Sequence, residues 1–133
     1  MIVLDTHVLT WWVNGGTELT KAARRAIEQE GKAEAGAIAV SAISAWEIAM
    51  LVNKGRLILS MDVESWLQTV AEIPHLRFIP VDNDIALKST MLPEPFHKDP
   101  ADRMIVATAR ALAAPLVTAD GNIQAYPHVK TIW

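Results

Sequence analysis

The sequence predicts an α/β fold in which a parallel sheet of about five strands is covered by helices on both faces. Short apolar runs rich in β-branched residues alternate with segments whose apolar residues recur at helical spacing, and hairpin signals are absent. Parallel strands require such intervening helices as crossover connections. The length of 133 residues fits one core, and contents of 51% hydrophobic and 20% charged residues exclude a disordered chain. We therefore expect a single domain spanning residues 1–133.

The first half of the chain begins with a predicted strand at residues 2–4, which are all apolar, as in a strand buried on both faces. A short apolar helix over residues 8–13 follows and ends at Asn14-Gly15-Gly16. The helical spacing of apolar residues over 19–27 predicts a second helix that stops near Gly31. Residues 37–40 form the next predicted strand, and helices over 44–53 and 63–70 complete this half.

The second half continues the alternation. Residues 78–81 are a strand candidate, and Pro80 favours a sheet edge or a strand end because proline cannot donate to a ladder. A short helix over 85–90 leads into a proline-rich loop at 92–100, after which a helix begins at Asp99-Pro100. Residues 116–118 and 129–132 are the last predicted strands.

The composition excludes several classes of function. The charge balance of 12 basic and 15 acidic residues gives −3, so the chain is not a globally basic nucleic-acid coat. The absence of cysteine excludes disulfides, thiolate catalysis and cysteine-ligated metals. No stretch is apolar over the ~20 residues that a membrane-spanning helix needs, and Asp5 interrupts the apolar start, which argues against a signal peptide. We expect a soluble, cytoplasmic protein with no membrane segment.

Four carboxylates lie near the predicted carboxyl ends of strands, where parallel sheets usually bind ligands. Asp5 directly follows the first strand, and Asp120 closely follows the strand at 116–118. Glu47 and Asp102 lie early in helices that follow a strand or a loop. In an open parallel sheet, ligands bind outside the carboxyl ends of the strands, so these side chains are placed to converge there. Converging carboxylates repel one another, and a hard divalent cation such as Mg²⁺ or Mn²⁺ would offset that repulsion.

Asp5 and Glu47 also have purely structural interpretations. Asp5 is a favoured N-cap residue for the helix that starts at Thr6. Glu47 follows Ser44 at the spacing of a capping box, in which the two residues satisfy the first backbone N–H groups of a helix.

The remaining acids have structural interpretations too. Asp99 with Pro100 is the preferred start of a helix, so we interpret Asp99 as mainly a cap with a supporting role at the site. Asp102 then lies in the first helical turn, where the helix dipole favours an acid. Asp120 precedes Gly121 and fits an ordinary turn. The joint arrangement, and no single acid, carries the functional interpretation.

Four segments together resemble a known family. They are residues 1–12 (MIVLDTHVLTWW), 40–48 (VSAISAWEI), 97–109 (HKDPADRMIVATA) and 116–120 (LVTAD). In their order and spacing they resemble PIN-domain ribonucleases, particularly VapC-type toxins of bacterial toxin–antitoxin systems. The similarity covers essentially the whole chain.

The resemblance implies an Mg²⁺- or Mn²⁺-dependent endoribonuclease that hydrolyses phosphodiester bonds of RNA, is blocked by a cognate antitoxin protein and is usually a homodimer. The catalytic and metal-binding residues that it implies are Asp5, Glu47, Asp102 and Asp120. Asp5 and Asp102 are the expected direct ligands, whereas the other two act directly or through water. Small hydroxyl positions near the metal correspond to Thr6 and Thr118.

An acidic protein needs local basic groups to hold RNA. Arg103 is the first candidate because it adjoins Asp102, and the others are Arg24, Arg25 and Lys98. The alternative is that these residues belong to ordinary solvated helix faces.

Two competing functions remain open at this point. A phosphatase of the haloacid-dehalogenase type would use Asp5 as a covalent nucleophile, although it usually has a second aspartate where this chain has His7. A non-catalytic Mg²⁺-binding module of the receiver type would need paired acids near the first strand and a lysine at the last, for which Lys130 is poorly placed.

Overall fold

A parallel sheet of five strands in the order β3-β2-β1-β4-β5 forms the centre of the computed structural model, which describes residues 1–133. Every pair of neighbouring strands is parallel, so the predicted fold class is confirmed. β3 lies at an edge of the sheet and ends at Ile79, directly before Pro80, which agrees with the expectation of a sheet edge or a strand end. The strands are β1 (Ile2–Leu4), β2 (Ile38–Ser41), β3 (Leu76–Ile79), β4 (Leu116–Val117) and β5 (Thr131–Ile132).

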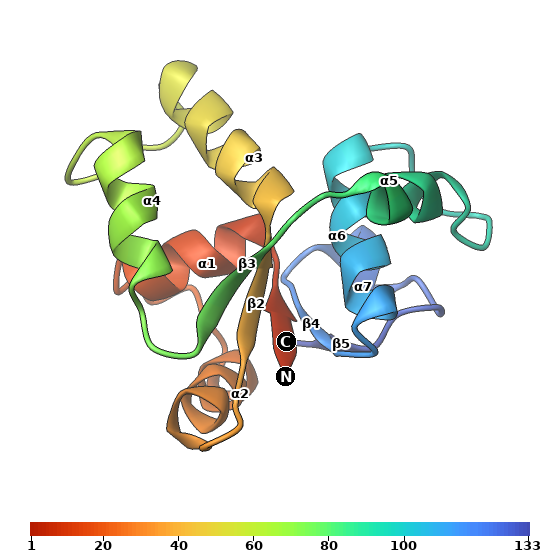
Figure 1. Cartoon of the computed structure of the whole chain (residues 1–133), viewed down its shortest axis with the longest axis horizontal. Helices are drawn as coiled ribbons and strands as arrows, with labels where there is room; N and C mark the ends of the chain where they lie inside the picture. Colours follow the sequence, from red (N-terminus) through yellow and green to blue (C-terminus); the bar gives the residue numbers. More distant parts are fainter.

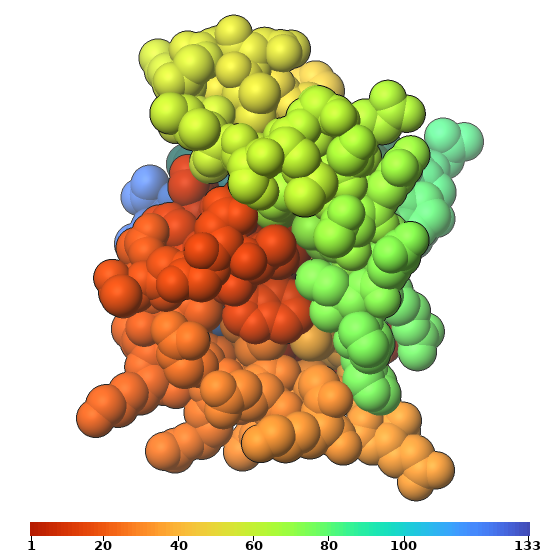
Figure 2. Space-filling model, turned by 90° about the vertical axis from the view of Figure 1, so that its left-hand side faces the viewer, coloured from red at the N-terminus to blue at the C-terminus, as the bar shows by residue number.

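Seven helices cover the two faces of this sheet (Figure 1). They are α1 (Thr6–Val13), α2 (Lys21–Lys32), α3 (Ala42–Asn53), α4 (Val63–Ala71), α5 (Asn83–Thr90), α6 (Pro100–Ala111) and α7 (Gly121–Gln124). The first four share one side of the sheet and the last three the other. Figure 2 shows the outer surface of the first side, where α1 and α2 lie next to α4. No helix is long and apolar enough to span a bilayer.

The molecule has two hydrophobic cores, one on each face of the sheet, and the strands contribute alternate side chains to each. Along β1, Ile2 and Leu4 pack with α1 to α4, whereas Val3 packs with α5 and α6. Neighbouring side chains of a strand point to opposite faces, so a run of consecutive apolar residues is the pattern of a strand covered on both sides. Val3 and Leu4 are 0% exposed.

The order of the strands explains where a site can form. The chain lays β2 and β3 on one side of β1, and later places β4 and β5 on the other side. Such a reversal opens a crevice at the carboxyl ends of the two strands that flank it, here β1 and β4. Asp5 and Thr118 directly follow these strands.

Several elements differ from the prediction. β3 spans Leu76–Ile79 where residues 78–81 were expected, and β5 spans only Thr131–Ile132 of the expected 129–132. α3 begins at Ala42 because Ser41, not Ser44, is its N-cap and accepts a hydrogen bond from the Ile43 N–H. α2 continues through Gly31 to Lys32. The short helix α7 was not predicted, since four residues cannot show an apolar period.

The fully buried strands predict a sharp contrast between two leucine substitutions. Leu116→Ala, at a 0% exposed position of β4, should lower the free energy of unfolding by about 2–5 kcal/mol. Leu87→Ala, at a 59% exposed position of α5, should change it by less than about 0.5 kcal/mol. Urea unfolding followed by circular dichroism measures both, and equal losses would contradict the assignment of the core.

Candidate active site

A hollow of about 400 Å³ lies at the carboxyl ends of β1 and β4. It brings together all four acids predicted from the sequence, and Asp99 as a fifth. Its lining residues are Asp5, His7, Trp11, Glu47, Asp99, Asp102, Ala119 and Asp120. We call it the acidic hollow.

Three of these acids are also N-caps. Asp5 caps α1 and accepts from the Thr6 N–H, Asp99 caps α6 and accepts from the Asp102 N–H, and Asp120 caps α7. The structural and the functional interpretations of these residues are therefore compatible. α1 and α7 directly follow the parallel strands β1 and β4 and so begin at the carboxyl edge of the sheet, where ligands bind, whereas α6 is brought there by the loop after α5.

Glu47 does not have the capping role that its spacing suggested. It lies in the second turn of α3, and its Oε1 accepts a hydrogen bond from Thr6 Oγ1 at 2.6 Å. Ser44 Oγ lies 2.8 Å from the same Thr6 hydroxyl. Because Thr6 has one hydroxyl proton and donates it to Glu47, Ser44 must be the donor to Thr6. Ser44 is thus a residue of the site that the sequence analysis missed, because its spacing from Glu47 was interpreted as a capping box.

Asp5 is held at both carboxylate oxygens. Its Oδ2 accepts from Thr118 Oγ1 at 2.7 Å, and its Oδ1 accepts from the Thr6 N–H at 2.8 Å. The Thr118 hydroxyl in turn accepts from the Asp120 N–H at 3.0 Å. These bonds fix the carboxylate beneath the hollow and tie its position to that of Asp120.

Burial and mutual repulsion raise the pKa of three carboxyl groups in the hollow. Burial, followed by the charges of Asp5, Asp99, Asp120 and Glu47, raises the pKa of Asp102 from its ordinary value of 3.8 to about 8. Burial also raises the pKa of Asp5, although its bonds to Thr118 and Thr6 act in the opposite direction. The pKa of Glu47 is raised by burial against its bond from Thr6. The protein alone therefore does not fully stabilise the ionised site.

His97 lies beside the most strongly perturbed acid. Its Nε2 is 3.2 Å from Asp102 Oδ2, yet this buried atom has no partner in hydrogen-bond geometry. The contact is therefore a close approach without a hydrogen bond, and it leaves the Asp102 oxygens without a donor from the protein.

The donor chemistry of the hollow fits a divalent cation. Carboxylate oxygens are the ligands that Mg²⁺ and Mn²⁺ prefer. Burial, and after it the neighbouring carboxylates, raise the pKa values of Asp102 and Glu47, and a cation would offset this cost of ionisation. No three acidic or histidine side chains are grouped tightly enough to form a ready ligand set. An ion held by three of these side chains would therefore require them to move closer together.

The expected RNA-contact residues do not line the acidic hollow. Arg103 is 13% exposed in its side chain and donates to the backbone oxygens of Ser89, Phe96 and His97 and to Glu94. These bonds hold the loop before α6 in place, and a contact of Arg103 with RNA stays a prediction.

The other candidates are exposed but differ in their distance along the chain from the acids. Arg24 and Arg25 lie on α2, which contacts β1, β2 and β5. Lys98 lies on the loop before α6, directly before Asp99, which lines the acidic hollow. Among these three candidates it is therefore the nearest to the acids along the chain.

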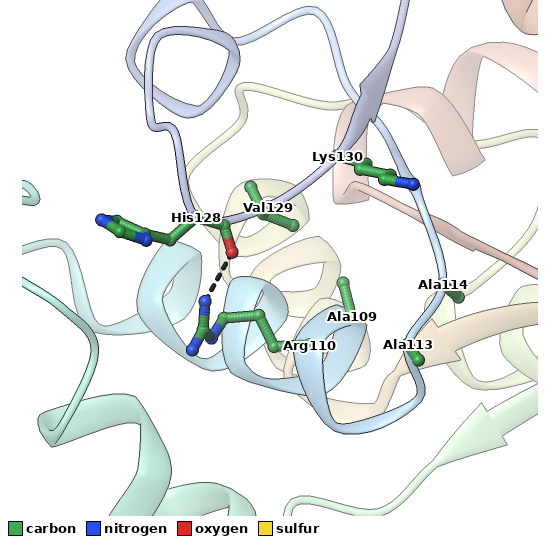
Figure 3. A pocket seen from close by; sticks show the side chains of 7 residues that line it. All are labelled: Ala109, Arg110, Ala113, Ala114, His128, Val129 and Lys130. Atoms are coloured by element: carbon green, nitrogen blue, oxygen red, sulfur yellow. Dashed lines mark hydrogen bonds between the residues drawn. The ribbon is translucent and has the colours of Figure 1, made fainter.

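A different hollow, of about 430 Å³, lies between the end of α6 and the segment before β5. Basic side chains line it, but they do not point toward one another (Figure 3). Figure 3 shows the Lys130 side chain and the Arg110 guanidinium directed away from each other, and the imidazole of His128 turned outward. Arg110 Nη1 donates to the backbone oxygen of His128 at 2.6 Å. Of these two hollows, the acidic hollow is therefore the one in which charged side chains converge.

The doubly covered parallel sheet and the acids at its reversal point define the class to which the protein belongs. The family description "PIN domain" matches residues 2–129, so the chain belongs to the PIN-domain family. Within that family it is similar to ribonuclease VapC22 of Mycobacterium tuberculosis H37Rv, with 39% identity over 134 residues that cover 99% of this chain and 98% of the relative.

Solved structures share the fold. A toxin–antitoxin complex from Klebsiella pneumoniae matches with a TM-score of 0.65 and 19% identity, covering 97% of this chain and 95% of that chain. VapBC2 from Rickettsia felis, bound to a DNA fragment from its promoter, matches with a TM-score of 0.71 and 20% identity, covering 98% and 97%.

The raised pKa of Asp102 predicts how stability depends on pH in EDTA. Between its unfolded value of 3.8 and its folded value of about 8, the folded protein keeps a proton that the unfolded chain releases. Stability contributed by this group is therefore lost as the pH rises through that range. Asp102→Asn should flatten the decline.

Urea midpoints measured from pH 4 to pH 8 provide the test. Asp84→Asn is the matched control, because Asp84 is exposed on α5 and pairs with Lys88 outside the hollow. A wild-type slope retained in Asp102→Asn would show that the carboxylates are not coupled as described.

Proposed function

We propose that this protein is a divalent-metal-dependent endoribonuclease that acts as the toxin of a toxin–antitoxin pair. The observation that carries the proposal is the convergence of four carboxylates from separate chain segments at the reversal point of the sheet: Asp5, Glu47, Asp102 and Asp120. Membership of the PIN-domain family and the 39% identity to a protein named a ribonuclease support it.

Each acid has a distinct part in this proposal. Asp5 is the fixed ligand, because Thr118 and the Thr6 N–H hold both of its oxygens. Asp102 faces it as the second direct ligand, with a carboxylate that accepts no hydrogen bond from the protein. A bound Mg²⁺ or Mn²⁺ would supply an acidified water as nucleophile and charge compensation for the phosphate.

Glu47 and Asp120 complete the rim of the site. Thr6 donates to one oxygen of Glu47, and the backbone of α7 donates to one oxygen of Asp120, so each retains a second oxygen without a protein donor. Such an oxygen can accept a proton from water or bind a cation through water. Ser44 and Thr6 form the hydrogen-bonded chain that orients Glu47.

The proposed partners are an RNA substrate, a cognate antitoxin protein and a second copy of the chain. A hollow of about 500 Å³ near α1 and α4, with Ile58 89% exposed and Met61 43% exposed, offers an apolar surface to a protein partner. This hollow belongs to the side of the molecule that Figure 2 presents.

The two competing functions have weaker support. A phosphatase with Asp5 as covalent nucleophile usually has a second aspartate two residues on, where this chain has His7. A receiver-like module would need a lysine at the site, and Lys130 lines a different hollow.

RNA cleavage by the purified chain tests the proposal. Mg²⁺ or Mn²⁺ should permit cleavage of structured RNA such as tRNA, and EDTA should stop it. Asp5→Asn keeps the shape and an acceptor oxygen but removes the charge, so it should slow cleavage by about two orders of magnitude or more. Asp84→Asn, at an exposed position of α5, should cleave like the wild type.

Gel analysis of end-labelled RNA gives the rates. Full activity of Asp5→Asn would contradict the metal-site proposal, and a trapped acyl-phosphate on Asp5 would favour the phosphatase instead.

A further inference from the structure

A second hollow of about 400 Å³ lies beside the acidic hollow, between the loop before α6 and the segment from α7 to β5. Its walls are mainly aromatic rings and prolines, and no lysine, arginine or carboxylate lines it. We call it the aromatic pocket. Its size is within the range of about 300–1,000 Å³ that is usual for small-molecule sites.

The aromatic walls are held rigidly. The ring of Phe96 packs against that of Tyr126 at 4.4 Å between centroids, and Tyr126 packs against His128 at 5.3 Å. Tyr126 is 4% exposed and its hydroxyl donates to the Pro93 oxygen at 2.6 Å. Arg103 binds the Phe96 backbone oxygen and places its guanidinium 5.9 Å from the centre of the same ring. A flat ligand would therefore meet preformed walls.

Polar groups that can read the edge of such a ligand lie on the rim. Asn122 is exposed, and its side-chain amide, which offers both a donor and an acceptor, makes no hydrogen bond within the protein. The imidazole of His128 is turned away from the hollow that Arg110 lines, as Figure 3 shows, and stands instead beside Tyr126. A neutral, flat ligand with hydrogen-bonding edges matches this combination, and a phosphate does not.

The aromatic pocket directly adjoins two of the acids. His97 lines the pocket, and its Nε2 lies 3.2 Å from Asp102 Oδ2. Asn122 also lines it, and its backbone N–H donates to Asp120 Oδ1 at 2.8 Å. If the acids hold a phosphodiester, the base of the nucleotide next to it can therefore reach this pocket.

We propose that the aromatic pocket binds the nucleobase of the RNA nucleotide next to the cleaved phosphodiester. The inference rests on the proposed ribonuclease function and adds the group that selects the cleavage position. Stacking on an aromatic wall accepts any base, whereas hydrogen bonds to the rim distinguish bases by their edges. The pocket thus accounts for both affinity and preference at one position of the substrate.

Filling the pocket provides the first test. Ala125 is exposed, lines the pocket and has helical backbone angles (φ −77°, ψ −14°), so it tolerates a larger side chain. Ala125→Phe should raise KM for RNA about tenfold, consistent with the loss of one stacked base. It should also flatten the base preference beside the cut, with kcat changed less than KM. Ala33→Phe, at the exposed end of α2, is the matched control and should behave like the wild type.

Nucleotide binding followed by NMR provides a test that does not depend on cleavage. The four ribonucleoside 5′-monophosphates, added with Mg²⁺, should shift the side-chain signals of Asn122 and His128 in the wild type and in Ala33→Phe, but not in Ala125→Phe. If RNA is not cleaved and these shifts occur, the proposed function fails and the pocket assignment remains.

The opposite results would overturn the inference. Unchanged signals with all four nucleotides would exclude a base in the pocket, as would an Ala125→Phe variant that cleaves with wild-type KM and preference. Shifts caused only by a peptide of the antitoxin would assign the pocket to the protein partner instead.

Discussion

The repulsion among carboxylates at one edge of the sheet is the constraint on which the site depends. Asp102 shows it most clearly, because burial and neighbouring negative charges raise its pKa to about 8. Thr118 and the Thr6 N–H offset part of this cost at Asp5 by donating to both of its oxygens. The remaining cost is the physical basis for proposing a cation, because a positive charge beside the carboxylates would favour their ionised forms.

The order of the strands brings these carboxylates together. Parallel strands end at the same edge, and α1 and α7 begin there directly after β1 and β4, so that their capping acids Asp5 and Asp120 lie at the reversal between these strands. Asp5, Asp99 and Asp120 stabilise helix starts and line the hollow at the same time. One set of residues therefore serves folding and the candidate site, and a substitution there must be tested for both effects.

Much of the fold was predictable because its signals are local. Runs such as residues 2–4 indicate strands covered on both faces, and Asp99-Pro100 marks the start of α6. The convergence of the acids was predictable because a parallel sheet fixes which ends of its strands meet. Ser44 was missed because a hydroxyl three residues before Glu47 has the same spacing in a capping box and in a hydrogen-bonded chain through Thr6. The hydrogen bonds of Arg103 were not predictable, because only the folded loop shows which backbone oxygens engage its guanidinium.

The aromatic pocket was not predictable at all, because Phe96 and Tyr126 come from two irregular segments with no period. The central claim of the account is nevertheless the cation between the carboxylates. Anomalous diffraction from crystals grown with Mn²⁺ tests it most directly. The account predicts an anomalous peak between the carboxylates of Asp5 and Asp102, within the coordination distance of their oxygens. No peak at that position in millimolar Mn²⁺, with the fold intact, would contradict it.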